Sequence, residues 1–242
     1  MTTYQKLDKC PRVIIDAGLI YYHRIDELKS LCKETLLGYS SLKRYCVDYQ
    51  LVFVYPFRGL YDSYVERILR GERILVINTS VEHVLSVIGS SKPLYLDPYA
   101  ERDLGVNDLY YYDSIVIGGI VDKPPRKRLT TLLIERNLPR VDSRRISLRG
   151  SIVGVPSEIN SVIEIILRTL MYRDLERAIR ETQSKRDAMV RVLVELSRAR
   201  RSIKSREDVE RIYRELEKWL NIDLVVFRRA LHRAGIPRDL WI

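Results

Sequence analysis

Short apolar runs alternate with amphipathic stretches from Arg12 to about Leu170, and this alternation constrains the fold more than any other feature. Apolar runs of three to six residues are too short for helices and fit buried strands, whereas the amphipathic stretches between them have helical spacing. This alternation is typical of an α/β domain. The expected strands lie at residues 13–15, 50–55, 73–78, 94–96 and 114–117, and the expected helices at residues 25–39, 81–87 and 161–170.

The chain changes character after Leu170. Residues 172–242 contain no glycine before Gly235 and no convincing strand, and they predict helices near residues 174–202, 206–220 and 223–234. Ser205, followed by two acidic residues, is a suitable N-cap for the middle helix. We therefore expect an N-terminal tail at residues 1–11, an α/β domain at residues 12–170 and an all-helical basic region at residues 171–242.

The composition of this 242-residue chain excludes several classes of protein. Hydrophobic residues make up 46% of it, which is ample for a core and argues against wholesale disorder. No run of eighteen apolar residues predicts a membrane span, and the polar first eleven residues show no secretory signal. Cys10, Cys32 and Cys46 match neither a disulfide framework nor a zinc pattern, so a reducing cytoplasm is expected.

Positive charge is in excess and locally concentrated. The 42 lysines and arginines outnumber the 32 acidic residues, a net charge of +10 that favours a polyanionic partner without identifying it. Residues 122–150 and residues 185–206 each carry a net charge of +6. The second segment is either a solvated helix face or a phosphate-binding patch, and the return to net negative charge at residues 207–217 makes it a local feature.

The most informative stretch is a buried strand that ends in Gly118 and Gly119, followed by Asp122 in a basic loop. Paired glycines allow a backbone to approach a ligand closely, but they also mark bulges and tight bends, and the local pattern leaves both interpretations open. The stretch is not a dinucleotide-binding fingerprint, and neither a P-loop nor a serine nucleophile elbow is present. The three histidines, His23, His83 and His232, are isolated from one another and from the cysteines, so they predict core or surface positions and not a metal site.

The motifs together resemble a known family. They are Gly118-Gly119-Ile120-Val121-Asp122-Lys123, Lys127-Arg128-Leu129-Thr130, the segment Ser157 to Ile165, the strand Leu94-Tyr95-Leu96-Asp97 and the helix from Ser30 to Tyr39. Over roughly residues 12–170 the chain resembles the SPOUT-fold tRNA methyltransferases that modify N1 of the purine at position nine, the Trm-ten family, in its archaeal type. It departs from that family at Glu34, where the family often has glutamine.

This resemblance implies a fold and a cofactor. The fold would be a parallel sheet whose C-terminal part threads a trefoil knot, an exception to the rule that chains do not thread loops. The knot would bind S-adenosylmethionine, with S-adenosylhomocysteine as the product and no metal. By this resemblance the donor-binding residues are Leu96, Asp97, Gly118, Gly119, Lys123, Arg126, Lys127, Ser143, Pro156, Ser157, Glu158, Ile159 and Asn160.

The same resemblance makes Asp122 the catalytic carboxylate. N1 of guanine carries a proton that must leave, so a carboxylate can act as a general base there. N1 of adenine has a free lone pair, and Asp122 would then orient the ring. The structural alternative is an ion pair between Asp122 and Lys123 or Arg126.

The implied partner is tRNA, bound in the cytoplasm by a monomer and without a membrane. The expected RNA-binding residues are basic and come from both charged segments: Lys123, Arg126, Arg144, Arg145, Arg198, Arg200, Arg201 and Lys204. Three alternatives remain open. They are a SPOUT methyltransferase acting on rRNA or another RNA position, a non-catalytic RNA-binding protein, and a helical protein-interaction module attached to a degenerate domain.

Overall fold

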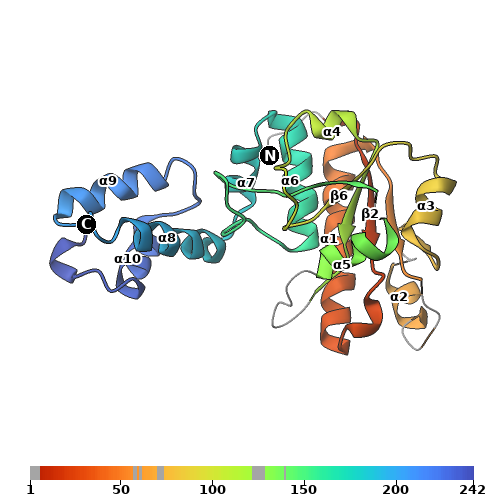
Figure 1. The fold of residues 1–242 in the computed structure, drawn as a ribbon, viewed down its shortest axis with the longest axis horizontal. Coiled ribbons are helices and arrows are strands. Elements are labelled where there is room, and N and C mark those ends of the chain that lie inside the picture. Colours follow the sequence, from red (N-terminus) through yellow and green to blue (C-terminus); the bar gives the residue numbers. More distant parts are fainter. Residues whose placement is uncertain (1–5, 57–58, 60–61, 70–73, 122–128, 139) are drawn as a thin grey trace. The chain divides into compact units, whose positions relative to one another are not determined.

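The computed structural model describes residues 6–56, 59, 62–69, 74–121, 129–138 and 140–242. The chain forms two compact units. The first comprises Met1–Ile146 and Ser157–Leu175, and the second comprises Ser147–Pro156 and Glu176–Ile242. Figure 1 shows strands and helices in the first unit and helices in the second. The domain limits expected from the sequence stay a prediction.

A six-stranded sheet forms the centre of the first unit, and every neighbouring pair in it is parallel. The five strands expected from the apolar runs are all present. The sixth lies at the edge and was not expected, because its sequence Asp-Ser-Arg is polar and it becomes a strand only by pairing with its neighbour. In sheet order the strands are β5 (Leu75–Ile77), β4 (Leu51–Val54), β2 (Arg12–Asp16), β7 (Ser114–Gly118), β6 (Pro93–Leu96) and β8 (Asp142–Arg144).

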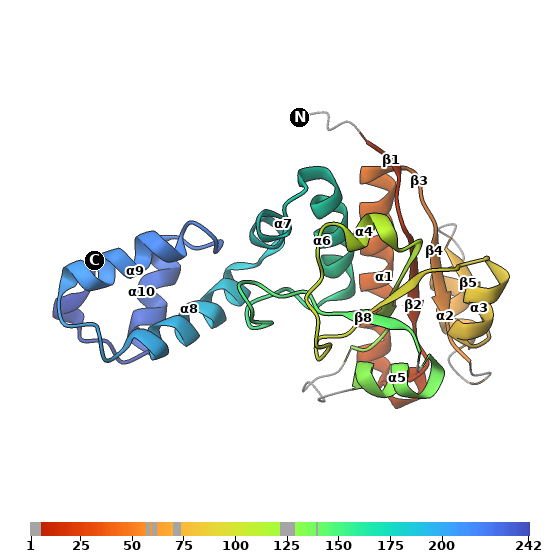
Figure 2. The same cartoon turned by 45° about the horizontal axis from the view of Figure 1, so that its top comes forward.

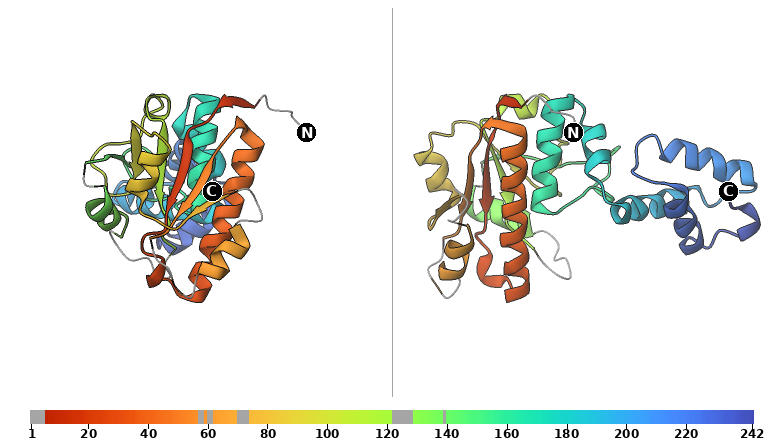
Figure 3. Two further views of the ribbon diagram at one scale, coloured as in Figure 1. Left: turned by 90° about the vertical axis from the view of Figure 1, so that its right-hand side faces the viewer. Right: turned by 180° about the vertical axis from the view of Figure 1, so that it is seen from behind.

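Helices cover both faces of this sheet. On one face, Val84 of α3 (Val81–Val87) and Leu133 of α5 (Leu129–Asn137) join Ile14, Val52 and Val116 in one buried cluster. Successive strand residues point to opposite faces, and α1 (Ile25–Tyr45) and α6 (Ile159–Tyr172) cover the other face (Figure 3). The helices of the first unit are α1 (Ile25–Tyr45), α2 (Asp62–Leu69), α3 (Val81–Val87), α4 (Asp108–Tyr111), α5 (Leu129–Asn137) and α6 (Ile159–Tyr172), with a short 3-10 turn at Ile20–Tyr22.

Gly38 lies where α1 packs against α6. An added Cβ at this position would lie 2.5 Å from Cδ1 of Ile163 in α6, so the end of the Ile163 side chain would have to shift. Both helices are longer than the sequence predicted, since the buried stripe of α1 continues through Leu42 and Tyr45. This contact holds the start of α6 against the middle of α1.

A second, two-stranded parallel sheet pairs β1 (Leu7–Lys9) with β3 (Cys46–Asp48) (Figure 2). It brings Cys10 and Cys46 together, and the two form a disulfide with their Cα atoms 6.1 Å apart. The expectation drawn from cysteine spacing was therefore wrong for this pair, because the pairing depends on a long-range strand contact. Cys32 is free and buried, and burial raises the pKa of its thiol to about 11.

Four helices make up most of the second unit: α7 (Leu175–Thr182), α8 (Lys185–Ala199), α9 (Arg206–Leu216) and α10 (Leu224–Arg233), followed by the 3-10 turn η3 (Arg238–Leu240). The single helix expected at residues 174–202 is in fact two, because Ser184 caps a new helix by accepting a hydrogen bond from the Asp187 N–H. Ser205 caps α9 in the same way, as the sequence predicted.

Two buried side chains organise the second unit. Gln183 donates to the Gly154 carbonyl at 2.7 Å and accepts from the Asn221 N–H at 2.9 Å, so it joins three separate segments. The Trp219 ring is contacted by the guanidinium groups of Arg149 and Arg191, 4.6 and 5.2 Å from the ring centroid. Arg191 thus belongs to the interior of the unit although the sequence counts it among the positive charge, whereas Arg149 is exposed and covers the ring from outside. None of the described helices combines the length and the apolar character needed to cross a bilayer.

Candidate active site

The carboxyl ends of β2, β7 and β6 lie side by side in the sheet, and the direction of the chain changes at this point. After β2 the chain adds β4 and β5 on one side, and it then adds β6, β7 and β8 on the other. Ligands of open α/β sheets bind outside the carboxyl ends of the strands at such a switch point. The residues that end these three strands are therefore the candidates for a ligand site.

Asp16, the last residue of β2, is a buried carboxylate with identified partners. It accepts hydrogen bonds from the Gly18 N–H at 2.9 Å and from the Tyr95 hydroxyl of β6 at 3.0 Å. Burial, together with the Asp16 charge, raises the pKa of Tyr95 well above its usual range, so the hydroxyl keeps its proton. This pair links the ends of two strands across the intervening β7, and the sequence had not singled it out.

The glycine pair packs against the end of β2. The Gly119 N–H donates to the Asp16 carbonyl at 2.7 Å, and an added Cβ would lie only 3.0 Å from that oxygen and from Ile15 Cγ2. At Gly118 an added Cβ would lie 3.2 Å from the Thr130 hydroxyl oxygen of α5. Close backbone approach within the protein is therefore sufficient reason for Gly119, and the structural interpretation of the motif holds at that position.

Asp97 follows β6 and is also buried. Its carboxylate accepts from the Tyr99 N–H at 3.0 Å and from the Thr131 hydroxyl at 2.9 Å, which ties the first turn of α5 to the end of β6. Leu96 pairs in register with Ile117, the residue before the glycines. The sheet thus brings four predicted donor-binding residues, Leu96, Asp97, Gly118 and Gly119, to two neighbouring strand ends.

His23 holds the segment that follows the glycines. Its Nε2 accepts a hydrogen bond from the Val121 N–H at 3.0 Å, and its side chain is buried. Because Nε2 is the acceptor, the imidazole is neutral with its proton on Nδ1. Sequence reasoning placed His23 in the core or on the surface and missed this contact, since 98 residues separate the partners. Val121 directly precedes Asp122, the predicted catalytic residue.

Four predicted residues, Asp122, Lys123, Arg126 and Lys127, lie outside the described residues. The remaining donor-binding candidates fall in three places. Ser143 of β8 pairs with Tyr95 of β6, one residue before the strand end. Ser157 and the N-cap Glu158 precede α6, Ile159 and Asn160 are its first residues, and Pro156 belongs to the second unit.

Glu34 is the residue that holds the start of α6. Its carboxylate accepts the Ile159 N–H at 3.0 Å and so satisfies one of the unpaired donors at the helix N-terminus. The negative charge also interacts favourably with the helix dipole. The sequence marked Glu34 only as a departure from the family's usual glutamine, and it contained no signal of this contact.

The predicted RNA-binding arginines differ in their surroundings. Arg144 is 12% exposed, is paired with Asp108 at 3.4 Å and donates to the Tyr112 hydroxyl at 3.1 Å, so it is better placed to hold β8 than to contact a phosphate. Arg145 is paired with Asp103 at 2.6 Å. In α8, Arg198 is paired with Glu195, whereas the exposed Arg200, Arg201 and Lys204 make no ion pair with a described residue.

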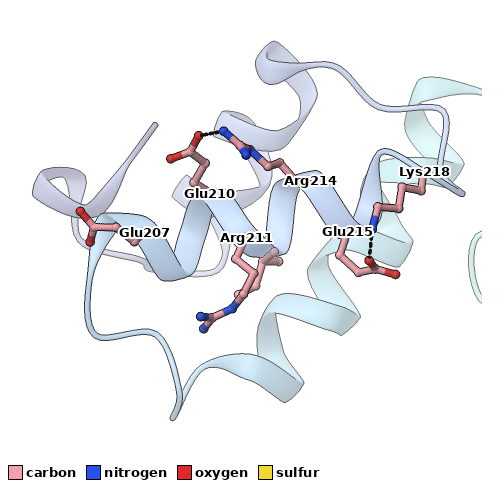
Figure 4. A pocket seen from close by; sticks show the side chains of 7 residues that line it. Glu207, Glu210, Arg211, Arg214, Glu215 and Lys218 are labelled. Carbon is pink, nitrogen blue, oxygen red and sulfur yellow. Dashed lines mark hydrogen bonds and ion pairs between the residues drawn. The ribbon is translucent and has the colours of Figure 1, made fainter.

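A hollow of about 630 Å³ lies along α9 (Figure 4). Its residues belong to the second unit, whereas the strand ends belong to the first. Its charges neutralise each other: Arg214 is paired with Glu210 at 2.6 Å and Lys218 with Glu215 at 2.7 Å. This arrangement is a solvated helix face and not a ligand site. No group of three or more His, Cys, Asp or Glu side chains is placed to hold a metal ion within the described ranges.

Fold and site together define a class: a parallel α/β protein with a candidate ligand site at the carboxyl ends of β2, β7 and β6. Comparison with known proteins narrows this class. A family model described as protein arginine N-methyltransferase SFM1-like matches residues 35–150, just under half of the chain.

Over nearly its whole length the chain is similar to two archaeal enzymes. It is 32% identical over 234 residues to the tRNA (adenine(9)-N1)-methyltransferase of Sulfolobus acidocaldarius, covering 95% of this chain and 71% of that protein. It is 30% identical over 250 residues to the tRNA (guanine(9)-/adenine(9)-N1)-methyltransferase of Thermococcus kodakarensis, covering 97% of this chain and 66% of that protein. The chain thus spans about two thirds of the length of these relatives.

A solved structure agrees with these relatives. The structure of Sulfolobus acidocaldarius Trm10 in complex with S-adenosylhomocysteine matches with a TM-score of 0.66 and 26% identity, over 93% of this chain and 69% of that one. The chain belongs to the Trm10 family of tRNA (purine-9) N1-methyltransferases.

Proposed function

We propose that this protein methylates N1 of the purine at position 9 of tRNA, with S-adenosylmethionine as the methyl donor. The observation that carries the proposal is the 32% identity to a tRNA (adenine(9)-N1)-methyltransferase over 95% of the chain. The product is S-adenosylhomocysteine, the molecule bound in the Sulfolobus acidocaldarius structure. The activity is assigned to the cytoplasm and to a monomer.

The strand ends suit such a donor. S-adenosylmethionine supplies a methyl group on a cationic sulfonium, together with an adenosine and an amino-acid end. At the end of β7, the half-buried Gly118 places no side chain between the backbone and a ligand, whereas Gly119 packs against β2. Asp97 fixes the turn after β6 through two hydrogen bonds. We assign donor binding to Leu96, Asp97, Gly118 and Gly119, to the predicted residues of the loop after Asp122, and to Ser143 and residues 156–160.

The order of strands supports a trefoil knot. β8 lies on the opposite side of β6 from β7, and after β8 the chain continues parallel to the segment that follows β6, where the Arg145 N–H donates to the Arg102 carbonyl. The first unit then resumes at Ser157 and α6. The proposed knot requires in addition that the chain between β8 and α6 passes through an earlier loop.

We assign the catalytic role to Asp122. When guanine is the target, its carboxylate takes the proton from N1 as the methyl group arrives, so the nucleophile keeps its electron pair. When adenine is the target, the Asp122 carboxylate accepts a hydrogen bond from the exocyclic amine and holds the ring in line with the methyl group. The proposal is supported by His23, which fixes the backbone of Val121 one residue earlier.

Incubation of the protein with unmodified tRNA and the donor, followed by mass spectrometry of the nucleosides, tests the proposal. We expect 1-methyladenosine, 1-methylguanosine or both, at position 9. Asp122→Asn should lower methyl transfer to guanine by about 10²- to 10⁴-fold, the range for loss of a general base, while donor binding stays near that of the parent. Asp48→Asn, the same change at an exposed residue of β3, is the matched control and should leave the rate unchanged.

The SFM1-like match favours a second candidate, methylation of a protein arginine. It spans only residues 35–150, whereas the tRNA methyltransferase relatives align over nearly the whole chain. Methylation of tRNA and methylation of a protein arginine would use the same donor site. The two candidate functions are therefore distinguished by which molecule carries the methyl group after the reaction. Labelled methyl groups recovered in peptides, with none in tRNA, would reject the tRNA proposal.

A further inference from the structure

The end of the second unit contains a groove with an unusual lining. Its volume is about 310 Å³, and it lies between α10 and the turn η3. Every residue that lines it is basic or aromatic: Arg228, Arg229, His232, Arg233, Arg238 and Trp241. Residues 224–242 contain one acidic residue, Asp239, against four arginines. The groove therefore places several positively charged side chains beside an aromatic ring.

The arginines of the groove are exposed. Arg229, Arg233 and Arg238 form no ion pair with any described Asp or Glu. Arg228 donates through Nε to the Ile242 oxygen at 2.6 Å, which fixes its guanidinium at the edge of the groove. Along α9, by contrast, Arg211 and Arg214, and Lys218 just beyond the helix end, are paired with carboxylates of α9 at 2.5 to 2.7 Å. Cations paired with neighbouring carboxylates are typical of a solvated helix face. A surface that binds anions needs cations without such carboxylate partners.

The spacing of the basic residues places them on one side of α10. Arg229 and Arg233 are four residues apart, so these two like charges are neighbours on the helix surface, and Arg228 and His232 have the same spacing. Basic residues in the last turn stabilise a helix through its dipole, which accounts for His232 and Arg233. It does not account for Arg228 and Arg229, which lie in the middle of the helix. Like charges held together here favour a polyanion that neutralises them.

Trp241 is held at the edge of this charge. Its indole N–H donates to the Ile236 carbonyl at 2.9 Å, and the His232 ring meets it edge-on with the centroids 6.2 Å apart. The Arg238 guanidinium lies 5.9 Å from the centroid of the indole. The ring is half-buried and fixed, so a base can stack on it without first ordering a mobile side chain.

We propose that this groove binds RNA, with phosphates on Arg228, Arg229, Arg233 and Arg238 and an unpaired base on Trp241. Arginine contacts to phosphates supply affinity without reading sequence, and an aromatic side chain accepts any base. The inference rests on the proposed function, because tRNA is the RNA that the enzyme must hold. It adds a binding surface that the charge runs in the sequence did not indicate, since α10 lies outside both of them.

Two triple variants with the same loss of charge test it. Arg228→Gln, Arg229→Gln and Arg233→Gln together remove the groove charge. Arg211→Gln, Arg214→Gln and Lys218→Gln together remove three paired charges from α9. Affinity for unmodified tRNA is measured by fluorescence anisotropy at several salt concentrations. The groove variant should bind on the order of tenfold more weakly or worse, and its log Kd against log salt slope should fall by about 2 to 3, whereas the α9 variant should bind like the parent.

Single variants separate stacking from charge. Trp241→Ala should weaken binding by roughly 5- to 100-fold with an unchanged salt slope, and Trp241→Phe should recover part of the loss. Replacing the three groove arginines with lysine keeps the slope and shows that the fold is intact. Thermal melting of every variant identifies any that fails to fold.

Several outcomes overturn the inference. The inference is wrong if the folded groove variant binds tRNA as tightly as the parent. It is also wrong if the α9 variant loses as much tRNA affinity as the groove variant, because the loss would then reflect net charge alone. Groove-dependent binding to anionic lipid vesicles with no effect on tRNA overturns the inference as well, by assigning the surface to a membrane. If the parent methylates tRNA and the groove variant binds tRNA unchanged, the proposed function stands and the proposal that the groove binds RNA is refuted. Absence of methyl transfer by the parent, with groove-dependent tRNA binding retained, refutes the proposed function instead.

Discussion

At the scale of single residues, the contact between His23 and Val121 is the most direct link between the described site and the predicted catalytic carboxylate. A buried neutral imidazole accepts the backbone N–H of the residue just before Asp122. A carboxylate that must align a base depends on the backbone that carries it. His23 is therefore a positioning residue, although it is not itself expected to touch the substrate.

Replacement of His23 tests this role. His23→Ala should lower kcat for methyl transfer by about ten- to a hundredfold, because a displacement of about 1 Å at a reacting group has effects of this size. His23→Gln, which retains an acceptor, should recover part of the rate. Single-turnover kinetics and donor binding by calorimetry are the measurements. A parent-like kcat in a folded His23→Ala protein would contradict the role, as would a loss explained by weaker donor binding alone.

At the scale of elements, the start of α6 depends on a contact with α1. Glu34 accepts the Ile159 N–H, and Gly38 one turn later allows the two helices to approach closely. The predicted donor-binding residues 157–160 lie at this helix start. Their position thus depends on helix packing as well as on their own sequence.

We expect Glu34→Ala to destabilise the first unit by about 0.5–2 kcal/mol, the usual cost of losing an N-terminal helix cap. Glu34→Gln should cost less, because the amide oxygen still accepts while the charge is lost. Urea unfolding followed by circular dichroism measures both variants. Equal stability of the alanine variant and the parent would show that the cap is not needed. Ser40→Ala, at an exposed position on the same helix, serves as the control.

At the scale of the whole molecule, a covalent link joins two parts of the chain that are distant in sequence. The disulfide between Cys10 and Cys46 closes a loop with a sequence separation of 36 residues around β2 and α1. Closing a loop of this length restricts the unfolded chain, and the chain-entropy model assigns it about 3–4 kcal/mol. It does not by itself decide the compartment, since intracellular proteins of hyperthermophilic archaea also carry disulfides.

Reduction of this disulfide should lower the melting temperature of the protein. For a chain of this size, 3–4 kcal/mol corresponds to roughly 6–16 °C. Calorimetry with and without dithiothreitol measures the change, and the double variant Cys10→Ser and Cys46→Ser should show the same loss and no further response to reductant. A melting temperature that reductant leaves unchanged would contradict the stabilising role.

The sequence alone determined what depends on neighbouring residues. Apolar runs such as Val13–Ile15 predict strands, and Ser205 predicts a cap, because periodicity and capping act over a few positions. The same holds for the glycine pair, whose motif carried the resemblance to the family. The polar edge strand β8 was missed because it becomes a strand only through its partner.

Only the tertiary structure decided which distant groups meet. It paired Cys10 with Cys46, gave His23 its backbone partner, placed Arg144 and Arg191 beside carboxylates, and left Arg229 and Arg233 of α10 without an ion pair to any described carboxylate. Each of these outcomes depends on contacts between residues far apart in the chain. A charge count treats all arginines alike, whereas the availability of each one for a phosphate depends on the carboxylate that folding brings beside it.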